Sequence, residues 1–362
     1  MADIFDYLSW RGDLSISASP FCDLDALVLS EFSYLPMQSV FTGGMNERLT
    51  IGEIAERFRE EDVPEEIRFM TFEEDAELLR RMSRTARFRD MPVSGYADII
   101  RPSKDLQFAA VTADTGDGCL FAAFRGTDGT VAGWKEDFTL SYKEHTGGQQ
   151  CAESYVNTLF AGGTKGLRLG GHSKGGNLAV YAAAFCDPMI RQRICGVWAF
   201  DAPGFHEELT AAPEIRAITP RIRSFIPESS VVGMLLSGSE AEHTIVKSTS
   251  SGIRQHFIYS WELMGTHFVE AESISKSGAL VNKAISGLLE EFDDDDRKSF
   301  TEAIFGVLEA PEKATLREIQ RGRFSSYSVM LRAVRSMPEK QQNALRDGLK
   351  KLLKSAVKGQ NN

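Results

Sequence analysis

The segment from residue 166 to residue 185 constrains the fold of this chain more than any other part of the sequence. A strand-like run, LRLGG, leads into His172-Ser173-Lys174, and the small-residue stretch GGNLAVYAAAF follows. So sharp a change from strand to helix forces the corner residue toward strained backbone angles, and flanking glycines remove side chains that would clash. The pattern G-x-S-x-G is typical of a nucleophile elbow, with Ser173 at its tip. The alternative is a tight glycine turn with an incidental serine.

Short apolar segments alternate with helical segments around this elbow. FAAVTAD (108–114) and CLFAAFRG (119–126) predict two strands joined by a tight turn, and a helix is expected over 152–160. The alternation continues through ICGVWAFDAPGF and IRSFIPESS. Repeated strand–helix units predict an α/β fold with a mainly parallel sheet and helices on both faces.

Charge and cysteine content exclude several classes of protein. The first 310 residues hold 29 Lys and Arg against 47 Asp and Glu, so we expect no nucleic-acid partner, because such binding depends on neutralising phosphates. The five cysteines form no CxxC pair, which argues against a disulfide framework or a zinc site. The opening MADIFDYLSWRGDLS lacks the order of a secretory signal. A reducing compartment, and therefore a cytoplasmic location, is expected.

A serine nucleophile needs donors for the oxyanion that forms on the carbonyl it attacks. The backbone N–H of Lys174, directly after Ser173, is one expected donor. Thr127 follows the strand that ends in AAFRG, and its N–H and hydroxyl would supply the other. Thr127 is alternatively an ordinary turn residue.

The serine also needs a base and an orienting carboxylate, in the chain order Ser, acid, His. His256, in GIRQHF after a polar Ser/Thr stretch, is favoured as base over His243, which looks solvated, and His267, which would begin a C-terminal helix. Asp201 ends the apolar run VWAFD, at the edge of the sheet where catalytic groups collect, unless it merely caps the next turn. Glu228, in FIPESSVV, is the rival acid.

Several motifs resemble the fungal-type (class 3) triacylglycerol lipases. FRGTDGTVAGWKEDF is similar to their Phe-Arg-Gly-Thr/Ser segment, and GGHSKGGNLAVYAA resembles their Gly-His-Ser-Leu-Gly-Gly elbow. A bacterial lipase-like family of unknown function is a closer likeness over about residues 3–265, through DYLSWRGDLSISASPFCDLDALVLSEFSYL and QHFIYSW. The resemblance implies an α/β-hydrolase fold, Ser173 as nucleophile, Thr127 in the oxyanion hole and His256 as base.

The sequence departs from the class 3 pattern in two places. The usual Asp-x-Val carboxylate is missing, because the matching stretch reads Glu228-Ser229-Ser230-Val231-Val232. Either Glu228 substitutes for it, Asp201 supplies the carboxylate from the preceding strand, or a dyad works with the assistance of Ser230. Lys174 also stands where the family usually has Leu, which makes the elbow more polar.

These features predict an intracellular serine hydrolase that cleaves a carboxylic ester, of lipid or acyl type, through an acyl-enzyme on Ser173. Water would release the acyl group, so no metal or organic cofactor is expected. The alternative is a catalytically silent hydrolase fold that binds a lipid or a protein partner. A third interpretation is a peptidase or thioesterase with the same machinery, since leaving-group specificity resides in the pocket.

Residues 1–270 are expected to form the catalytic domain, with a helical insertion at about 45–90, and 271–362 a helical region packed on or appended to it. The acidic run Asp293–Asp296 lacks the spacing of a calcium loop and predicts a solvated turn. Within 340–362, leucines lie on one helical face with lysines interleaved. Such a basic amphipathic helix would contact an anionic membrane, or would pack its apolar stripe on the protein's own core.

Overall fold

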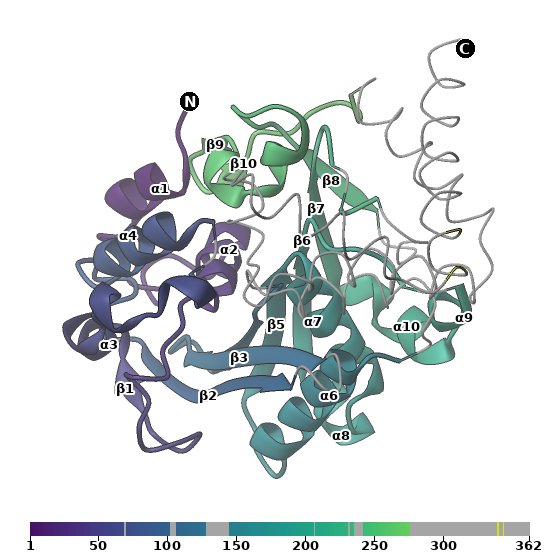
Figure 1. Ribbon diagram of the computed structural model, residues 1–362, viewed down its shortest axis with the longest axis horizontal. Coiled ribbons are helices and arrows are strands. Elements are labelled where there is room, and N and C mark those ends of the chain that lie inside the picture. The colour runs from purple at the N-terminus through teal and green to yellow at the C-terminus, as the bar shows by residue number, and fades with distance from the viewer. Residues whose placement is uncertain are drawn as a thin grey trace.

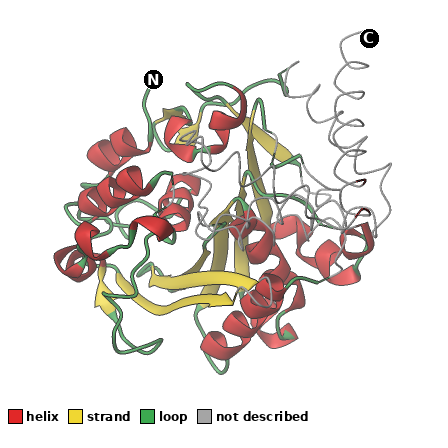
Figure 2. Cartoon of the chain, viewed as in Figure 1, coloured by secondary structure: helices red, strands yellow, loops and turns green. Residues whose placement is uncertain are grey.

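The protein has three layers, with one β-sheet between two layers of helices. The computed structural model describes residues 1–68, 70–101, 106–127, 145–205, 207–230, 232–234, 242–275, 339 and 343. In Figures 1 and 2, α1 to α4 lie on one side of the sheet, and α6, α7 and α10 lie on the other. The acidic run at 293–296 and the basic stripe within 340–362 lie outside the described residues.

The middle layer is an eight-stranded sheet whose strands follow one another in chain order. Its strands are β1 (Leu49–Thr50), β2 (Pro92–Arg101), β3 (Leu106–Asp114), β4 (Cys119–Phe124), β5 (Gly166–His172), β6 (Ile194–Phe200), β7 (Ile222–Pro227) and β8 (His243–Val246). The pairs from β1 to β4 are antiparallel, and the pairs from β4 to β8 are parallel. The predicted hairpin formed by 108–114 and 119–126 is therefore confirmed as β3 and β4, and the parallel half of the sheet begins at β4.

The two helical layers cover the two faces of this sheet, as expected from the alternation in the sequence. In the described part of the chain, the helices of four or more residues are α1 (Ile4–Arg11), α2 (Asp23–Phe32), α3 (Ile51–Arg57), α4 (Phe72–Met82), α6 (Gly147–Phe160), α7 (Lys174–Phe185), α8 (Pro188–Arg191), α9 (Glu207–Thr210) and α10 (Pro213–Ile218). Short 3₁₀ turns are η1 (Glu60–Asp62), η2 (Glu65–Ile67), η4 (Thr219–Arg221), η5 (Gly252–His256) and η6 (Ile258–Ser260). The predicted helix over 152–160 lies within α6, which begins five residues earlier, and α3 and α4 lie within the predicted helical stretch at 45–90.

Strand β3 shows why the sheet is buried on both faces. Phe108 and Ala110 join the core beneath α6 and α7, whereas Val111 and Ala113 join the core beneath α1 to α4. Successive side chains of a strand point to opposite faces, so an almost continuous apolar run is what a doubly covered strand requires.

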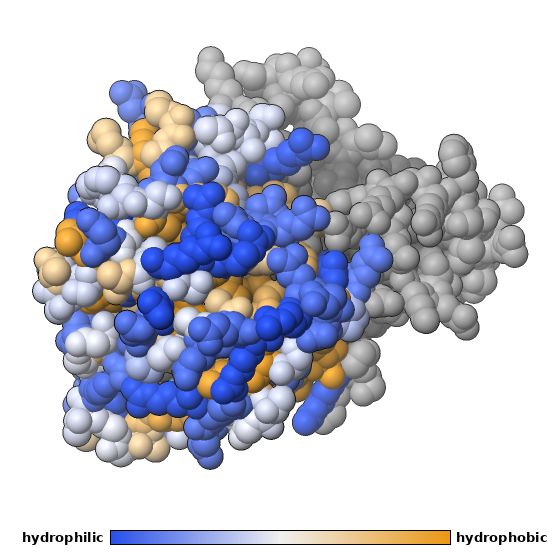
Figure 3. Space-filling model, turned by 90° about the vertical axis from the view of Figure 1, so that its left-hand side faces the viewer, coloured by the Kyte–Doolittle hydropathy of each residue, from blue (hydrophilic) through white to orange (hydrophobic). Residues whose placement is uncertain are grey.

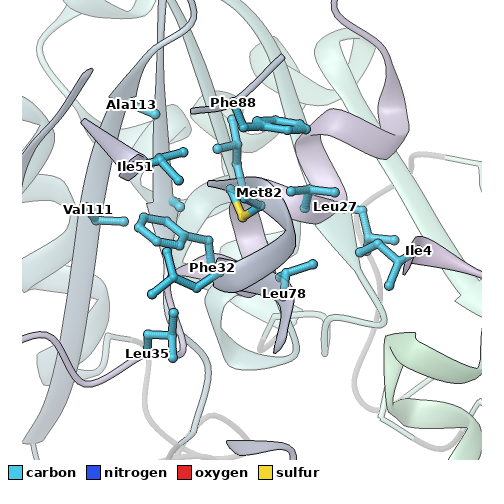
Figure 4. Close-up of a cluster of buried hydrophobic side chains, with 14 of the residues drawn as sticks. Ile4, Leu27, Phe32, Leu35, Ile51, Leu78, Met82, Phe88, Val111 and Ala113 are labelled. Atoms are coloured by element: carbon cyan, nitrogen blue, oxygen red, sulfur yellow. The ribbon is translucent and has the colours of Figure 1, made fainter. Parts of the chain in front are cut away.

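The core on the α1–α4 side draws side chains from distant parts of the chain. Ten of them are labelled in Figure 4, where four helices and β3 meet: Ile4, Leu27, Phe32, Leu35, Ile51, Leu78, Met82, Phe88, Val111 and Ala113. Burying one such aliphatic or aromatic side chain contributes about 1.5–3 kcal/mol. The outer surface of this side is mostly hydrophilic, with scattered apolar areas (Figure 3). Within the described part of the chain, no helix has the length and apolar character required to cross a lipid bilayer.

A ribbon of β9 (Leu263–Met264) and β10 (His267–Phe268) follows the main sheet. The expectation that His267 begins a C-terminal helix is therefore wrong. His267 pairs with Met264 across a turn in which Gly265 has φ 64°. A positive φ at glycine favours a tight reversal of the chain at this point.

A buried ion pair holds α2 in the helical layer. The side chains of Asp25 on α2 and Arg87 are 0% exposed, with 2.5 Å between an Arg87 nitrogen and the Asp25 carboxylate. The Tyr7 hydroxyl donates to the same carboxylate, and Arg87 also donates to three main-chain carbonyls between residues 14 and 20. Because both charges have several hydrogen-bond partners, the pair fixes α2 relative to the loop that precedes it and the loop that follows α4.

Arg87→Leu should lower the free energy of unfolding by about 3–5 kcal/mol, because it leaves the Asp25 carboxylate buried without its counter-charge. Arg89→Leu is the matched control, since the Arg89 side chain is 65% exposed and lies 4.0 Å from Asp90. Such exposed pairs contribute about 1 kcal/mol or less. Urea unfolding of both variants measures the difference, and similar losses in the two would contradict the role assigned to the buried pair.

Candidate active site

Ser173 occupies the corner between β5 and α7. Its backbone angles are φ 58° and ψ −133°, in a region that residues with a side chain rarely adopt. The Ser173 N–H donates to the carbonyl of Phe200 at the end of β6, and the Ser173 carbonyl accepts from the N–H of Gly176. These two hydrogen bonds hold the strained residue in place at the carboxyl edge of the sheet.

Glycines allow three segments to meet at this corner. A Cβ on Gly171 would lie 2.3 Å from the carbonyl carbon of Gly175, and a Cβ on Gly175 would lie 2.1 Å from the carbonyl oxygen of Phe124. A Cβ on Gly126 would lie 2.7 Å from the carbonyl oxygen of His172. The end of β4 therefore packs directly against the elbow, as a loop that carries an oxyanion donor must.

Thr127 lies at the end of this β4 segment and is buried. Residues 128–144, which contain the rest of the lipase-like FRGTDG segment, lie outside the described residues. The role of Thr127 as an oxyanion donor stays a prediction.

Lys174 is the first residue of α7, and its side chain is buried. Its ammonium donates to the main-chain carbonyl and to the side-chain oxygen of Gln107 on β3, at 3.1 and 2.5 Å. Lys174 stands where the class 3 lipases usually have Leu, and its side chain links the start of α7 to β3 of the sheet. The predicted oxyanion donor is the main-chain N–H of Lys174. The hydrogen bonds to Gln107 use the side-chain ammonium, so they do not occupy that N–H.

Asp201 and His256 are hydrogen-bonded to each other. Asp201 follows β6 directly, and its Oδ2 lies 2.6 Å from Nδ1 of His256, the last residue of η5. The other carboxylate oxygen accepts from the hydroxyl of Ser230 at 2.5 Å and from the N–H of Gly233 at 3.0 Å. The Asp201 side chain is 0% exposed and that of His256 is 16% exposed. The carboxylate therefore fixes the orientation of the imidazole ring and leaves Nε2 as the ring nitrogen that does not face Asp201.

Backbone strain also marks Asp201. With φ 42°, it is the one residue besides Ser173 that combines a side chain with a positive φ in the described part of the chain. Its N–H donates to the carbonyl of Phe225 on β7, which holds this conformation. Strained residues of this kind cluster at functional sites because the surrounding structure must enforce them.

Glu228, the rival acid, lies just after β7. Its main-chain N–H donates to Val246 on β8, and no described hydrogen bond or ion pair joins its side chain to His256. The Ser230 hydroxyl donates to Asp201, and no described hydrogen bond joins Ser230 to His256. Among the three alternatives left open by the sequence, the geometry favours Asp201 as the acid.

The other two downstream histidines lie elsewhere. His243 is the first residue of β8, where its Nδ1 lies 2.8 Å from the hydroxyl of Ser224, and burial lowers its pKa. His243 is half-buried rather than solvated, because it pairs with Ser224 where β8 lies beside β7. His267 is exposed on β10.

Sequence reasoning missed two buried polar residues behind His256. His172, the last residue of β5, has its Nε2 2.8 Å from the main-chain oxygen of His256, and the two rings lie 4.6 Å apart. Its Nδ1 lies 3.3 Å from Oε2 of Glu31 on α2. An acid at each end of the apolar segment LDALVLSEF, Asp25 and Glu31, was the available signal for Glu31. His172 falls at a variable position of G-x-S-x-G, so the motif gives no sign of its role.

No group of three or more His, Cys, Asp and Glu side chains suited to a metal ion occurs among the described residues. The pairing of Asp201 with His256 is the arrangement in which a carboxylate orients an imidazole for general-base work. Ser173 follows β5 and Asp201 follows the neighbouring β6, and His256 in η5 reaches Asp201, so the described residues contain the three side-chain types of a catalytic triad at one edge of the sheet.

Comparison with known proteins places this fold in a family. The family model of the Mbeg1-like proteins matches residues 82–306. The chain belongs to the Mbeg1-like family. No curated protein matches it. The match spans β2 to β10 and includes Ser173, Asp201 and His256.

Solved structures similar to this Mbeg1-like protein include two lipases. One is the Rhizomucor miehei lipase propeptide complex, at 12% identity and a TM-score of 0.39, covering 62% of this chain and 67% of that one. The other is the M37 lipase, at 14% identity and a TM-score of 0.34, covering 58% of this chain and 67% of that one. The mostly parallel sheet, its flanking helices and the turn at Ser173 form an α/β-hydrolase fold, as expected.

Gly175→Ala should lower the free energy of unfolding by about 1–3 kcal/mol, since the new methyl group would overlap the main chain at Phe124. Gly43→Ala is the control, because its Cβ would meet only the flexible side chain of Glu47, at 3.1 Å. Thermal unfolding compares the two variants. Equal stability would mean that β4 and α7 are not in the close contact described.

Proposed function

We propose that this protein is a serine hydrolase that cleaves a carboxylic ester, of lipid or acyl type, through an acyl-enzyme on Ser173. The observation that carries the proposal is the 2.6 Å hydrogen bond between Nδ1 of His256 and Asp201, at the sheet edge where the strained Ser173 also lies. A buried carboxylate on one ring nitrogen makes the other nitrogen an effective base.

In the first step, Ser173 Oγ attacks the ester carbonyl while His256 Nε2 takes the hydroxyl proton. The N–H groups of Lys174 and Thr127 stabilise the negative charge that forms on the carbonyl oxygen. One such donor contributes about 3–4 kcal/mol to the transition state. His256 then gives the proton to the departing alkoxide, which leaves as the alcohol. A water molecule, deprotonated by His256, attacks the acyl-enzyme and releases the acid.

Asp201 would stabilise the imidazolium formed in both steps. Its carboxylate is fully buried and accepts from Ser230 and Gly233 as well as from His256, so it keeps its position when the proton moves. A charge held in this way acts more strongly than one in water, because the low-polarity surroundings screen it less.

The alternative of a silent fold that binds a lipid or a protein depends on the missing Asp-x-Val carboxylate. Asp201 weakens that alternative, since it supplies a carboxylate to His256 from the preceding strand. Cleavage of thioesters or amides would use the same groups, and substrate comparison distinguishes them. The cytoplasmic location stays a prediction.

Ser173→Ala should abolish covalent labelling by a fluorophosphonate probe, because the attacking oxygen is removed while the fold is retained. Ser17→Ala, at an exposed position far from Ser173 in the sequence, should label like the wild type. Gel fluorescence measures labelling, and a thermal unfolding curve checks that each variant is folded. Labelling that survives in Ser173→Ala would disprove the assignment of the nucleophile.

Asp201→Asn should lower kcat for a p-nitrophenyl ester by about 10³–10⁴-fold, because the amide no longer favours the required imidazole tautomer. Glu228→Gln is the matched control and should change kcat by about threefold or less. A steep loss in Glu228→Gln with little loss in Asp201→Asn would reverse the assignment of the acid.

A further inference from the structure

Behind the catalytic imidazole, a chain of buried groups leads from α2 to the main chain of His256. Oε2 of Glu31 lies 3.3 Å from Nδ1 of His172, and Nε2 of His172 lies 2.8 Å from the main-chain oxygen of His256. The side chains of Glu31 and His172 are 2% and 3% exposed. No described hydrogen bond satisfies either of the two facing atoms, Glu31 Oε2 and His172 Nδ1, so the 3.3 Å approach is the closest described polar contact between them.

The chemistry of these groups determines where the protons are. A carbonyl oxygen only accepts, so Nε2 of His172 must carry a hydrogen and donate it to His256. Burial lowers the pKa of His172 to about 4, so the ring is neutral at pH 7 and Nδ1 presents a lone pair to Glu31. A carboxylate at 3.3 Å from that lone pair would be repelled, whereas a protonated carboxyl group would donate to it.

One proton is therefore shared by Glu31 and His172. It lies on the carboxyl group rather than on Nδ1, because an ion pair isolated from water is less favourable than a neutral hydrogen bond. Burial raises the pKa of Glu31 to about 8, and the nearby His256 lowers it in part, which agrees with a neutral carboxyl group at pH 7.

We propose that Glu31 is a positioning residue: its neutral carboxyl group, acting through His172, holds the main chain of His256 in the place that catalysis requires, and loss of its proton releases this hold. The proposal rests on the function proposed above. Asp201 binds the His256 side chain and His172 binds its main chain, so one residue is fixed at both ends.

Other hydrogen bonds hold the residue before His256, whereas His172 holds the main chain of His256 itself. The Trp261 indole donates to the carbonyl of Gln255, and the Gln255 side chain accepts from the N–H of Ser229. These bonds hold the residue before His256, and His172 alone bonds the His256 carbonyl among the described hydrogen bonds.

Other titratable groups face Glu31 from the elements packed around α2. Asp75 on α4 accepts from the hydroxyl of Tyr259 on η6 at 2.6 Å, and burial raises the pKa of both groups. The neighbouring Glu31 carboxyl group also raises the pKa of Asp75, so the two carboxyl groups disfavour each other's ionisation. His172 and His256 also face Glu31.

The sign of the pH dependence follows from these directions. The pKa of Glu31 is raised in the folded protein, so its hold on His172 is complete at neutral pH and is lost as pH rises through about 8. Once Glu31 is ionised, His172 either faces a carboxylate with a lone pair or turns its hydrogen to Glu31 and its lone pair to His256. The first arrangement keeps the Nε2–H bond to the His256 carbonyl but sets a lone pair against a carboxylate at 3.3 Å, and the second loses the bond to the carbonyl. Both arrangements weaken the hold of His172 on the main chain of His256.

The test is the pH dependence of kcat for a p-nitrophenyl ester between about pH 6 and about pH 10, corrected for spontaneous hydrolysis. Wild type should lose about tenfold or more of its rate along an alkaline limb centred near pH 8. Glu31→Gln keeps a donor without a titrating proton, so it should retain the pH 7 rate within about threefold and lack that limb. Glu31→Leu, with no donor, should lose about tenfold or more at pH 7 relative to wild type and should also lack the alkaline limb near pH 8.

Glu61→Gln removes an exposed carboxylate and is the matched control, with the wild-type pH profile expected. An alkaline limb that persists unchanged in Glu31→Gln would overturn the proposal, and so would a wild-type profile that stays flat to about pH 10. A merely structural role for Glu31 would alter stability in the variants but leave the shape of their pH profiles alone.

Nitrogen-15 NMR of the His172 ring gives a readout that does not depend on turnover. It should show hydrogen on Nε2 and a lone pair on Nδ1 at neutral pH, with a transition near pH 8 that Glu31→Gln abolishes. Hydrogen on Nδ1 at neutral pH would overturn the proton assignment. If neither labelling nor turnover depends on Ser173, the proposed function fails, while this spectrum still decides whether Glu31 holds the proton.

Discussion

A strained serine between a strand and a helix is the constraint on which the rest of this structure depends. Ser173 holds φ 58° because β5 must end and α7 must begin within one residue, at the edge where β4, β5 and β6 meet. Only glycines at 171 and 175 let these main chains approach so closely. The same close approach brings the Thr127 segment and the Asp201 turn beside the serine, so the packing that forms the corner also assembles the site.

Buried polar groups determine the geometry around this corner, because burying a polar or charged group lowers the stability of the fold unless it has a hydrogen-bond or charge partner. Asp201 has three donors, and the Asp25–Arg87 pair is closed by Tyr7 and main-chain carbonyls. Glu31 and His172 solve the same problem with one shared proton instead of a charge pair. A neutral hydrogen bond costs less in the interior, but it makes the arrangement sensitive to pH, since the proton that stabilises it is lost in alkali.

The sequence was a good guide wherever the signal was local. The hairpin of β3 and β4, helix α6 and the elbow each follow from residues adjacent in the chain, through apolar runs, turn glycines and small-residue spacing. His267 shows where that guidance fails: its neighbourhood is compatible with a helix start, yet pairing with Met264 makes it a strand. The choice between Asp201 and Glu228 was equally open, since each ends a strand of the same sheet edge.

The sequence by itself determined the α/β class, the nucleophile candidate and the set of acids and histidines, because these depend on periodicity and on motifs a few residues long. Only the tertiary structure decided which acid meets His256 and that Glu31 lies behind it. Those pairs join residues 55 and 141 positions apart in the chain, in the contacts Asp201–His256 and Glu31–His172. No local pattern encodes such contacts, because they form only when the sheet and both helical layers are packed together.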